Sequence, residues 1–244
     1  MCTILIAWRS LDDALLVLAG NRDELVARPS AAPARLSASP LIYGGRDLSA
    51  GGTWMAVDAG GRVAAVTNRR SGGGDEAAGN PALRSRGELP LMLLRDRDLA
   101  IALASVRARD YNPFNLVAVE GSRALVGHAR GGESPDITEL APGPHVLCVH
   151  DVDDPIHAKE ARIGRRLSEE LAGCRSAAGC VEVMTTLLGD HTAEADPRDA
   201  VCIHGDVYGT VSASVVVIGN GGAVRYRHAA GRPCTAPFEE VILA

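Results

Sequence analysis

Short apolar runs joined by tight turns constrain the fold of this chain more than any other feature. Thr3–Trp8 and Ala14–Ala19 are two such runs, separated by the polar turn Arg9–Asp13. Thr53–Asp58 and Arg62–Asn68 repeat the arrangement around the loop Ala59-Gly60-Gly61. Runs paired in this way predict β-hairpins, and their continuous apolarity predicts strands that are buried on both faces.

The rest of the chain alternates further strands with pairs of helices. Ser85 and Glu88 have the spacing of a helix capping box, and Pro90 follows early in the expected helix. Apolar residues at helical spacing predict this helix and three more: Leu89, Met92 and Leu93; Leu99, Leu103 and Val106, continuing toward Arg109; Ile163, Leu167 and Leu171; and Val181, Met184, Leu187 and Leu188. Further strands are expected over Asn115–Val119, Ala124–His128, His145–His150, Ala200–His204, Ser212–Ile218 and Ala223–His228.

This order of elements predicts the α+β class. Strands dominate both ends and helices come in pairs between them, which differs from a regular β-α-β alternation. The sequence contains no internal repeat and no long linker rich in proline and serine, so we expect a single domain over residues 1–244. The stretch Arg69–Arg84, rich in glycine, serine and arginine, predicts a mobile loop.

Composition and charge argue against several classes of partner. The chain is 46% hydrophobic and 23% charged, which is typical of a globular protein, and its formal net charge of −5 argues against a nucleic-acid partner. No apolar run approaches the ~20 residues of a membrane span, and no secretory signal is visible. We therefore expect a cytoplasmic protein without a membrane partner. The function classes given below add a small-molecule substrate or ligand as the expected partner, and the oligomeric state stays open.

The spacing of cysteines and histidines predicts neither a metal site nor a cofactor. The six cysteines form no CxxC pair, so most are expected to be small buried residues. Histidines gather at His145, His150 and His157, and Cys202 and His204 point the same way on one expected strand. None of these has the short, repeated spacing of a zinc site. The glycine-rich stretches 72–74 and 219–222 lack a nucleotide-binding fingerprint.

Cys2 is the residue most suited to covalent chemistry. Removal of the initiator Met1 before a small second residue would leave a cysteine that carries both a thiol and a free α-amine. The pKa of an α-amino group is about 7.7–8.0, so near neutrality this amine can take the proton of the thiol. Nucleophile and base would then belong to one residue, as in N-terminal nucleophile enzymes. The alternative is that position 2 simply requires a small residue.

Four consecutive polar residues, Asn21, Arg22, Asp23 and Glu24, follow the second apolar run directly. A hairpin returns this segment to the end of the sheet that carries Cys2. An arginine near the thiol would favour the thiolate, and a carboxylate could hold the α-amine. The segment is therefore a candidate rim of the site, with a solvated turn as the alternative.

Motifs spread over most of the chain resemble one known family. Residues 1–4 (MCTI) together with 19–24 (AGNRDE) are similar to the NRDE family, also called the transport and Golgi organisation protein 2 family. The resemblance continues in order through Arg28-Pro29, Gly51-Gly52-Thr53-Trp54, Ala65-Val66-Thr67-Asn68, Ser85-Arg86-Gly87-Glu88-Leu89, Phe114-Asn115-Leu116 and Tyr208-Gly209-Thr210.

The resemblance implies a fold and a set of roles. The family is similar to the choloylglycine hydrolase and penicillin V acylase group, which implies a four-layer αββα sandwich of the N-terminal-nucleophile hydrolase type. Cys2 would be the nucleophile, and Asn68 would match an asparagine that donates to the oxyanion. Asn21 and Glu24 keep the spacing of an arginine and an aspartate that flank the thiol in the hydrolases. Trp54 and Arg86 are candidate substrate-binding residues, with a core aromatic and a helix-start residue as the alternatives.

Two apolar residues stand where the family usually has polar ones. Val149 replaces an asparagine in the segment Leu147-Cys148-Val149, and Val211 replaces an arginine after Tyr208-Gly209-Thr210. Ile156 also replaces an expected tryptophan. Val149 and Val211 imply either a more apolar substrate or a loss of hydrolysis.

Two function classes follow. The first is an amidohydrolase or acyl-transfer enzyme that uses Cys2, without a cofactor. The second is a non-catalytic binding or trafficking protein on the same scaffold; haem is its candidate ligand, because haem handling is implied by the family resemblance and histidine or cysteine could ligate the iron.

Overall fold

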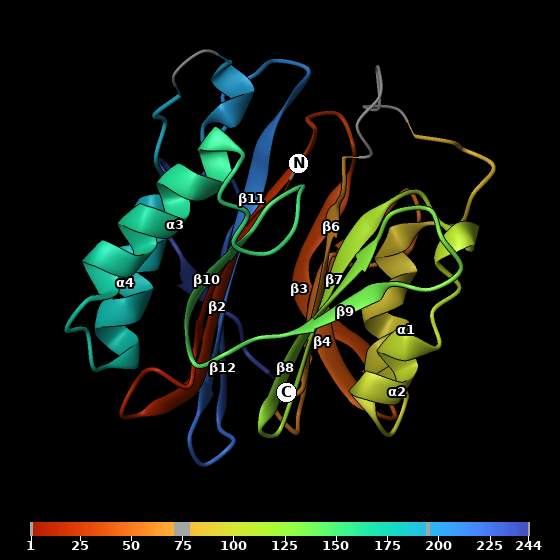
Figure 1. The fold of residues 1–244 in the computed structure, drawn as a ribbon, viewed down its shortest axis with the longest axis horizontal. Coiled ribbons are helices and arrows are strands. Elements are labelled where there is room, and N and C mark those ends of the chain that lie inside the picture. The colour runs from red at the N-terminus through yellow and green to blue at the C-terminus, as the bar shows by residue number, and fades with distance from the viewer. Residues whose placement is uncertain (1, 71–78, 194–195, 244) are drawn as a thin grey trace. The chain divides into compact units, whose positions relative to one another are not determined.

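The contacts of the chain divide it into two compact units. The computed structural model describes residues 2–70, 79–193 and 196–243. Unit 1 comprises Met1–Arg28, Ala141–Cys148 and Val152–Ala244, and unit 2 comprises Pro29–Leu140 and Val149–Asp151. Figure 1 follows the chain through both units by colour. The single domain expected from the sequence stays a prediction.

Unit 1 is an antiparallel sheet covered on one face by two helices. The six strands lie in the order β10 (Gly143–Leu147), β1 (Thr3–Trp8), β2 (Ala14–Leu25), β11 (Tyr208–Gly219), β12 (Val224–Ala229) and β13 (Glu239–Glu240). The helices α3 (Ala158–Leu171) and α4 (Ala177–Leu188) lie side by side against this sheet in Figure 1. A short 3-10 turn, Pro197–Asp199, precedes β11.

Alternation along the strands builds the core of unit 1. Leu5 and Ala7 of β1 and Val17 and Ala19 of β2 share one face and pack with apolar residues of the helices, because side chains two apart point the same way in a strand. Ser176 caps α4 by accepting from the Gly179 amide, a bond typical of helix starts. β1 and β2 are therefore interior strands of the sheet, with one face packed against the helices.

Unit 2 is a second antiparallel sheet with its own helical layer. Its seven strands lie in the order β3 (Ser30–Ala38), β4 (Leu41–Asp47), β5 (Met55–Asp58), β6 (Val63–Asn68), β7 (Phe114–Glu120), β8 (Arg123–Ala129) and β9 (Asp136–Glu139). The helices α1 (Leu89–Arg95) and α2 (Leu99–Ala104), with the 3-10 turns Arg86–Glu88 and Ala108–Asp110, complete it. Leu93, Leu103 and Phe114 belong to a buried core between these helices and the sheet.

The hairpins and the helix pairs predicted from the sequence are confirmed. The pairs β1–β2, β5–β6, β7–β8 and β11–β12 are antiparallel neighbours. The α+β class is likewise confirmed. Ser85 accepts from the Gly87 amide at the start of the 3-10 turn that leads into α1, where a capping residue was expected.

Several elements differ from the expectation. Ala200–His204 is not a strand: the Asn21 and Thr210 side chains bond to the backbone of Val201 and Ile203, and the one backbone bond shown to a strand joins Ile203 to Thr210 of β11. The strand expected over 145–150 is β10, which ends at Leu147, and α2 ends at Ala104 instead of continuing toward Arg109. Residues 71–78 of the expected mobile loop lie outside the described residues.

Among the described residues, no helix has the combination of length and apolar character that crossing a bilayer requires.

Candidate active site around Cys2

Cys2 lies at the start of β1, beside the polar segment of β2. Thr3 pairs with Asn21 across the two antiparallel strands, which places Cys2 next to Arg22. The Cys2 residue is 9% exposed. The register of β1 and β2 thus places the Cys2 thiol beside Asn21–Glu24, the segment that the sequence predicted to border the site.

The segment Asn21–Glu24 was expected to follow the second strand directly, but it is the last part of that strand, β2. β2 runs to Leu25 because β11 pairs with it over this whole stretch. Asn21, Arg22 and Asp23 are buried, and Glu24 is partly exposed. Three polar side chains are therefore held inside a sheet, which excludes the alternative of a solvated turn.

Asn21 holds two loops to the sheet. Its amide nitrogen donates to the backbone carbonyls of Leu188 and Val201, each at 2.9 Å. These carbonyls belong to the end of α4 and to the segment that was expected to be a strand. Because buried carbonyls need donors, Asn21 fixes the path of the chain on this side of the site.

Asp23 is the buried carboxyl of the site. The Thr210 hydroxyl donates to its Oδ1 at 2.6 Å, and the Tyr208 hydroxyl donates to its backbone carbonyl at 2.9 Å. Burial raises the pKa of the Asp23 carboxyl, although the charge of Lys159 and the Thr210 hydrogen bond both act to lower it. Burial therefore favours the neutral acid, whereas Lys159 and the Thr210 hydroxyl favour the ionised carboxylate.

Lys159 is a site residue that the sequence analysis missed. It is the only lysine of the chain, it is buried near the start of α3, and its Nζ donates to the carbonyl of Ala200 at 2.9 Å. A buried lysine is uncommon without a partner. The sequence signal that could have identified Lys159 is that it is the only lysine of the chain. Its charge also acts to lower the pKa of Cys148, which burial raises to about 12.

Arg22 and Glu24 form the charged edge of the segment. Arg22 lies 4.0 Å from the Glu24 carboxylate, and Arg28 lies 3.7 Å from the same group. The opposing strand β11 has a β-bulge here, since Asp23 pairs with Thr210 while Arg22 pairs with Ser212. Val211 is the extra residue. Bulges of this kind often lie beside active sites, where they redirect a side chain.

The environment of Cys2 favours the neutral thiol. Burial raises the pKa of the Cys2 thiol, and the nearby charge of Asp23 raises it further. The backbone of Asp23 and the charge of Arg22 act in the opposite direction without reversing the shift. Any reaction at this sulfur therefore needs a base to accept its proton.

Four of the predicted site residues lie in unit 2. Asn68 is the exposed last residue of β6, and Val149 is buried, with its carbonyl accepting from the Arg70 amide. Trp54 is half-buried and packs on the core of unit 2. Arg86 donates to the Pro113 carbonyl at 3.0 Å.

A polar network in unit 2 was not predicted. Asn115 accepts from Arg69 at 2.9 Å and lies 2.9 Å from Nδ1 of the buried His128. Arg69 and Arg130 both bind the Asp151 carboxylate. Burial lowers the pKa of His128 to about 4, against the opposing charge of Asp151. The motif Phe114-Asn115-Leu116 was the only sequence signal for this network.

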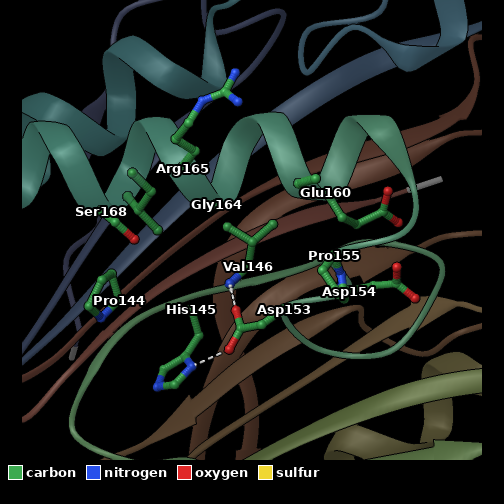
Figure 2. Close-up of a pocket in the computed structure, with 12 residues that line it drawn as sticks. Pro144, His145, Val146, Asp153, Asp154, Pro155, Glu160, Gly164, Arg165 and Ser168 are labelled. Atoms are coloured by element: carbon green, nitrogen blue, oxygen red, sulfur yellow. Dashed lines mark hydrogen bonds and ion pairs between the residues drawn. The ribbon is translucent and has the colours of Figure 1, made fainter.

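A pocket of about 270 Å³ lies elsewhere in unit 1. Figure 2 shows it between α3 and the segment that follows β10, with Glu160, Gly164 and Arg165 on the helix side. His145 and Asp153 line the opposite side and bind each other at 2.6 Å. The residues predicted for the Cys2 site are not among those that line this pocket.

A cluster of possible metal ligands also lies in unit 1. Ligand atoms of His191, Cys202, His204 and Cys234 all lie within 4.8 Å of one another. The sequence analysis noted Cys202 and His204 but set them aside, because they lack the short, repeated spacing of a zinc site. Only the fold brings the other two to them.

Comparison with known proteins identifies relatives of the whole chain. The sequence model of the family described as Transport and Golgi organisation 2 matches residues 1–229. The Transport and Golgi organization protein 2 homolog of Bos taurus is 28% identical over 241 residues, which cover 86% of this chain and 84% of that protein.

Comparison of structures identifies the fold. The Caenorhabditis elegans N-acylethanolamine-hydrolyzing acid amidase ortholog aligns with a TM-score of 0.56 at 13% identity, over 88% of this chain and 92% of that one. Penicillin V acylase from Agrobacterium tumefaciens aligns with a TM-score of 0.56 at 12% identity, over 94% of this chain and 83% of that one. The expected N-terminal-nucleophile hydrolase type of fold, the αββα sandwich, is therefore confirmed. Each unit, taken by itself, has one sheet and one helical layer.

Proposed function

The chain belongs to the Transport and Golgi organisation 2 family, and we propose that it is a hydrolase or acyltransferase that uses Cys2 as its N-terminal nucleophile on an amide or related acyl bond. The observation that carries this proposal is the position of Cys2 at the start of β1, beside Arg22 and the buried Asp23. The likeness to two amide-bond hydrolases supports it, because those proteins share the fold.

The α-amine of Cys2, freed by removal of Met1, is the proposed base. It accepts the thiol proton as the sulfur attacks the acyl carbon, and the tetrahedral intermediate then breaks its carbon–nitrogen bond. The ammonium gives the proton to the leaving amine. Water, or another acceptor, next attacks the thioester with the same amine as base, which releases the acyl group and restores the thiol.

The raised pKa of the Cys2 thiol supports a built-in base. A thiol that is neutral at pH 7 reacts slowly unless a group with a pKa near 7 takes its proton in the transition state. An α-amine has a suitable pKa of about 7.7–8.0. Asp23 supplies a buried carboxyl close enough to influence the thiol, and we assign it the role of holding the α-amine.

The remaining roles extend this proposal. Arg22 is assigned to stabilise negative charge on the sulfur, and Asn21 and Glu24 to position the segment. Asn68 is assigned to donate to the oxyanion, a kind of contact worth about 2.7–4 kcal/mol in other enzymes.

Substrate binding is assigned to four further residues. Val211, in the bulge opposite Arg22 and Asp23, favours a substrate that is apolar and uncharged at that point. Trp54, Arg86 and Val149 are the other substrate-binding candidates.

Two measurements test the nucleophile. Intact mass of purified protein is expected to lack Met1, and a thiol-directed acyl probe is expected to label Cys2. Turnover is measured with an N-acylethanolamine and penicillin V as amide substrates, because the names of the two structural neighbours contain these compounds. Cys2→Ala is expected to abolish labelling and turnover.

Cys174→Ser is the matched control, since Cys174 is a partly exposed thiol near α4 and belongs to none of the assigned roles. This variant is expected to keep both labelling and turnover. Unchanged turnover in Cys2→Ala, or turnover by protein that retains Met1, contradicts the proposal.

The competing function is a non-catalytic binding protein with haem as ligand. Titration with haem distinguishes it, because haem bound by histidine or cysteine shifts its Soret band. A Soret shift together with no turnover of any amide would favour this second function.

A further inference from the structure

Four side chains that bind soft or borderline metals converge in unit 1, and none of them has a role assigned above. They are His191, Cys202, His204 and Cys234, and their ligand atoms lie within 4.8 Å of one another. Two thiols and two imidazoles are a common ligand set of structural zinc sites. We propose that these residues form a tetrahedral site for a zinc ion.

The measured separations fit tetrahedral zinc. With zinc–sulfur bonds of about 2.3 Å, the two sulfurs of a tetrahedron lie about 3.8 Å apart, and sulfur and nitrogen lie about 3.6 Å apart. The Sγ atoms of Cys202 and Cys234 are 3.6 Å apart, and Nε2 of His204 is 3.3 Å from Sγ of Cys234. Each pair therefore needs to move by only a few tenths of an ångström.

The same distances argue against a disulfide. A disulfide requires sulfurs about 2.05 Å apart, far closer than the 3.6 Å between Cys202 and Cys234. A disulfide also leaves the two imidazoles without a role, although their ring centroids are 4.5 Å apart. Zinc accounts for all four side chains at once.

Each ligand lies outside the helices and strands of unit 1. His191 follows the end of α4, Cys202 and His204 belong to the segment before β11, and Cys234 lies between β12 and β13. Cys202 is buried, Cys234 is half-buried, and the two histidines are exposed. The ion would therefore enter from the surface and cross-link three loops, as structural zinc does.

Neighbouring groups orient the ligands. Nδ1 of His191 is 3.3 Å from the carbonyl oxygen of Cys202. Because a carbonyl only accepts, this nitrogen carries the proton and Nε2 keeps the lone pair that a metal needs. The carbonyl of Asp190 accepts from the Cys202 amide at 2.8 Å, and the Asp190 side chain binds Arg162 and Arg166. These bonds hold His191 and Cys202 together.

The zinc site also borders the residues that surround Cys2. Val201 and Ile203, on either side of Cys202, bind Asn21 and Thr210 respectively. The ion is therefore placed to fix the segment on which Asn21 and Thr210 depend. The zinc site itself does not depend on the function proposed for Cys2, because none of its four ligands has a part in that reaction.

Metal content tests the proposal directly. Protein without an affinity tag, purified under reducing conditions, is expected to contain one zinc ion per chain by elemental mass spectrometry. Replacement of zinc by cobalt(II) is expected to give the visible absorption of a tetrahedral, thiolate-bound ion. Cys234→Ser and His204→Asn are each expected to lower zinc affinity by roughly 100-fold or more, since even neighbours of ligands contribute 10–100-fold.

Two control variants match these changes. Cys174→Ser removes a thiol outside the cluster, and His157→Asn removes an exposed imidazole outside it, so both are expected to keep one zinc ion. Circular dichroism verifies that each variant is folded. Folded wild-type protein that takes up no zinc after reconstitution, a Cys202–Cys234 disulfide in reduced preparations, or full zinc content in Cys234→Ser overturns the proposal.

Discussion

Thr210 offers the sharpest test of how the Cys2 site is held together, because one hydroxyl serves two partners. Its Oγ1 donates to the Asp23 carboxyl at 2.6 Å and accepts from the Ile203 amide at 2.9 Å. Thr210 is 2% exposed, so water does not replace either bond when the hydroxyl is removed. Thr210→Val keeps the shape of the side chain and replaces only this hydroxyl with a methyl group.

The expected loss is about 3 kcal/mol in the free energy of unfolding. A buried donor left without a partner costs about 1–3 kcal/mol, and a hydrogen bond to a carboxylate contributes about 1.5–3 kcal/mol. The two effects share one atom and are not fully additive. For a chain of this length each kcal/mol lowers the melting temperature by about 2–4 °C, so the valine variant should melt about 6–12 °C lower.

Thr210→Ser is the matched control, because it keeps the hydroxyl and removes one methyl group. We expect a loss of about 1 kcal/mol, or 2–4 °C, for this variant. Differential scanning calorimetry of both variants measures the difference. Adding Asp23→Asn to each completes a double-mutant cycle, in which contacting residues couple by about 0.5–3 kcal/mol. A valine variant that melts within about 1 °C of the serine variant refutes the reasoning.

Two further predictions concern other parts of the chain. The ring nitrogens of His145 lie 2.6 Å from Asp153 and 2.7 Å from the Ala141 carbonyl, and these bonds raise its pKa although burial acts to lower it. The free energy of unfolding of wild type is therefore expected to exceed that of His145→Gln by its full amount below about pH 6.5. This difference is expected to disappear as the pH rises through the raised pKa. Denaturant unfolding of both proteins at several pH values measures it. Gly52→Ala would place a Cβ 2.4 Å from the backbone of Gly87, so we expect the free energy of unfolding in urea to fall by about 1–3 kcal/mol. Gly132→Ala is the control: no atom lies within 4 Å of its Cβ, so its free energy of unfolding should change by less than about 0.5 kcal/mol. Equal stability at every pH for His145→Gln and wild type, or equal effects of the two alanine substitutions, would contradict these arguments.

Local pattern was sufficient for the hairpins and insufficient for strands whose composition is atypical. The continuous apolar runs of β1 and β6 predict strands correctly, because residues on both faces of these strands are buried. β3 reads SAAPARLSA, which has neither alternation nor β-branched residues, so it was not predicted. It is a strand because β4 pairs with it. Pairing of this kind depends on the partner and not on the segment's own propensity.

Two predictions were wrong for the same reason, because distant parts of the chain decide the local structure. The polar part of β2 was not expected to be a strand, and the segment around Cys202 was. Asn21–Glu24 is polar but extended, because β11 binds it from a distant part of the chain. Ala200–His204 is apolar but irregular, since the Asn21 and Thr210 side chains satisfy its backbone. Cys2 and its neighbours could be nominated from the sequence, whereas Lys159 and the ligand cluster required the fold.

The interrupted layout of unit 1 governs the order in which the molecule can be assembled. Asp23 and Thr210 are neighbours in the sheet although 187 positions separate them. At 5–20 residues per second, a ribosome needs roughly 10–40 s to reach β11 after β2 has emerged. All of unit 2 is synthesised in that interval, so it can fold while the nascent β1–β2 hairpin still presents an open edge. Such an edge invites mispairing between chains, which makes the interval the time when chaperone protection matters most.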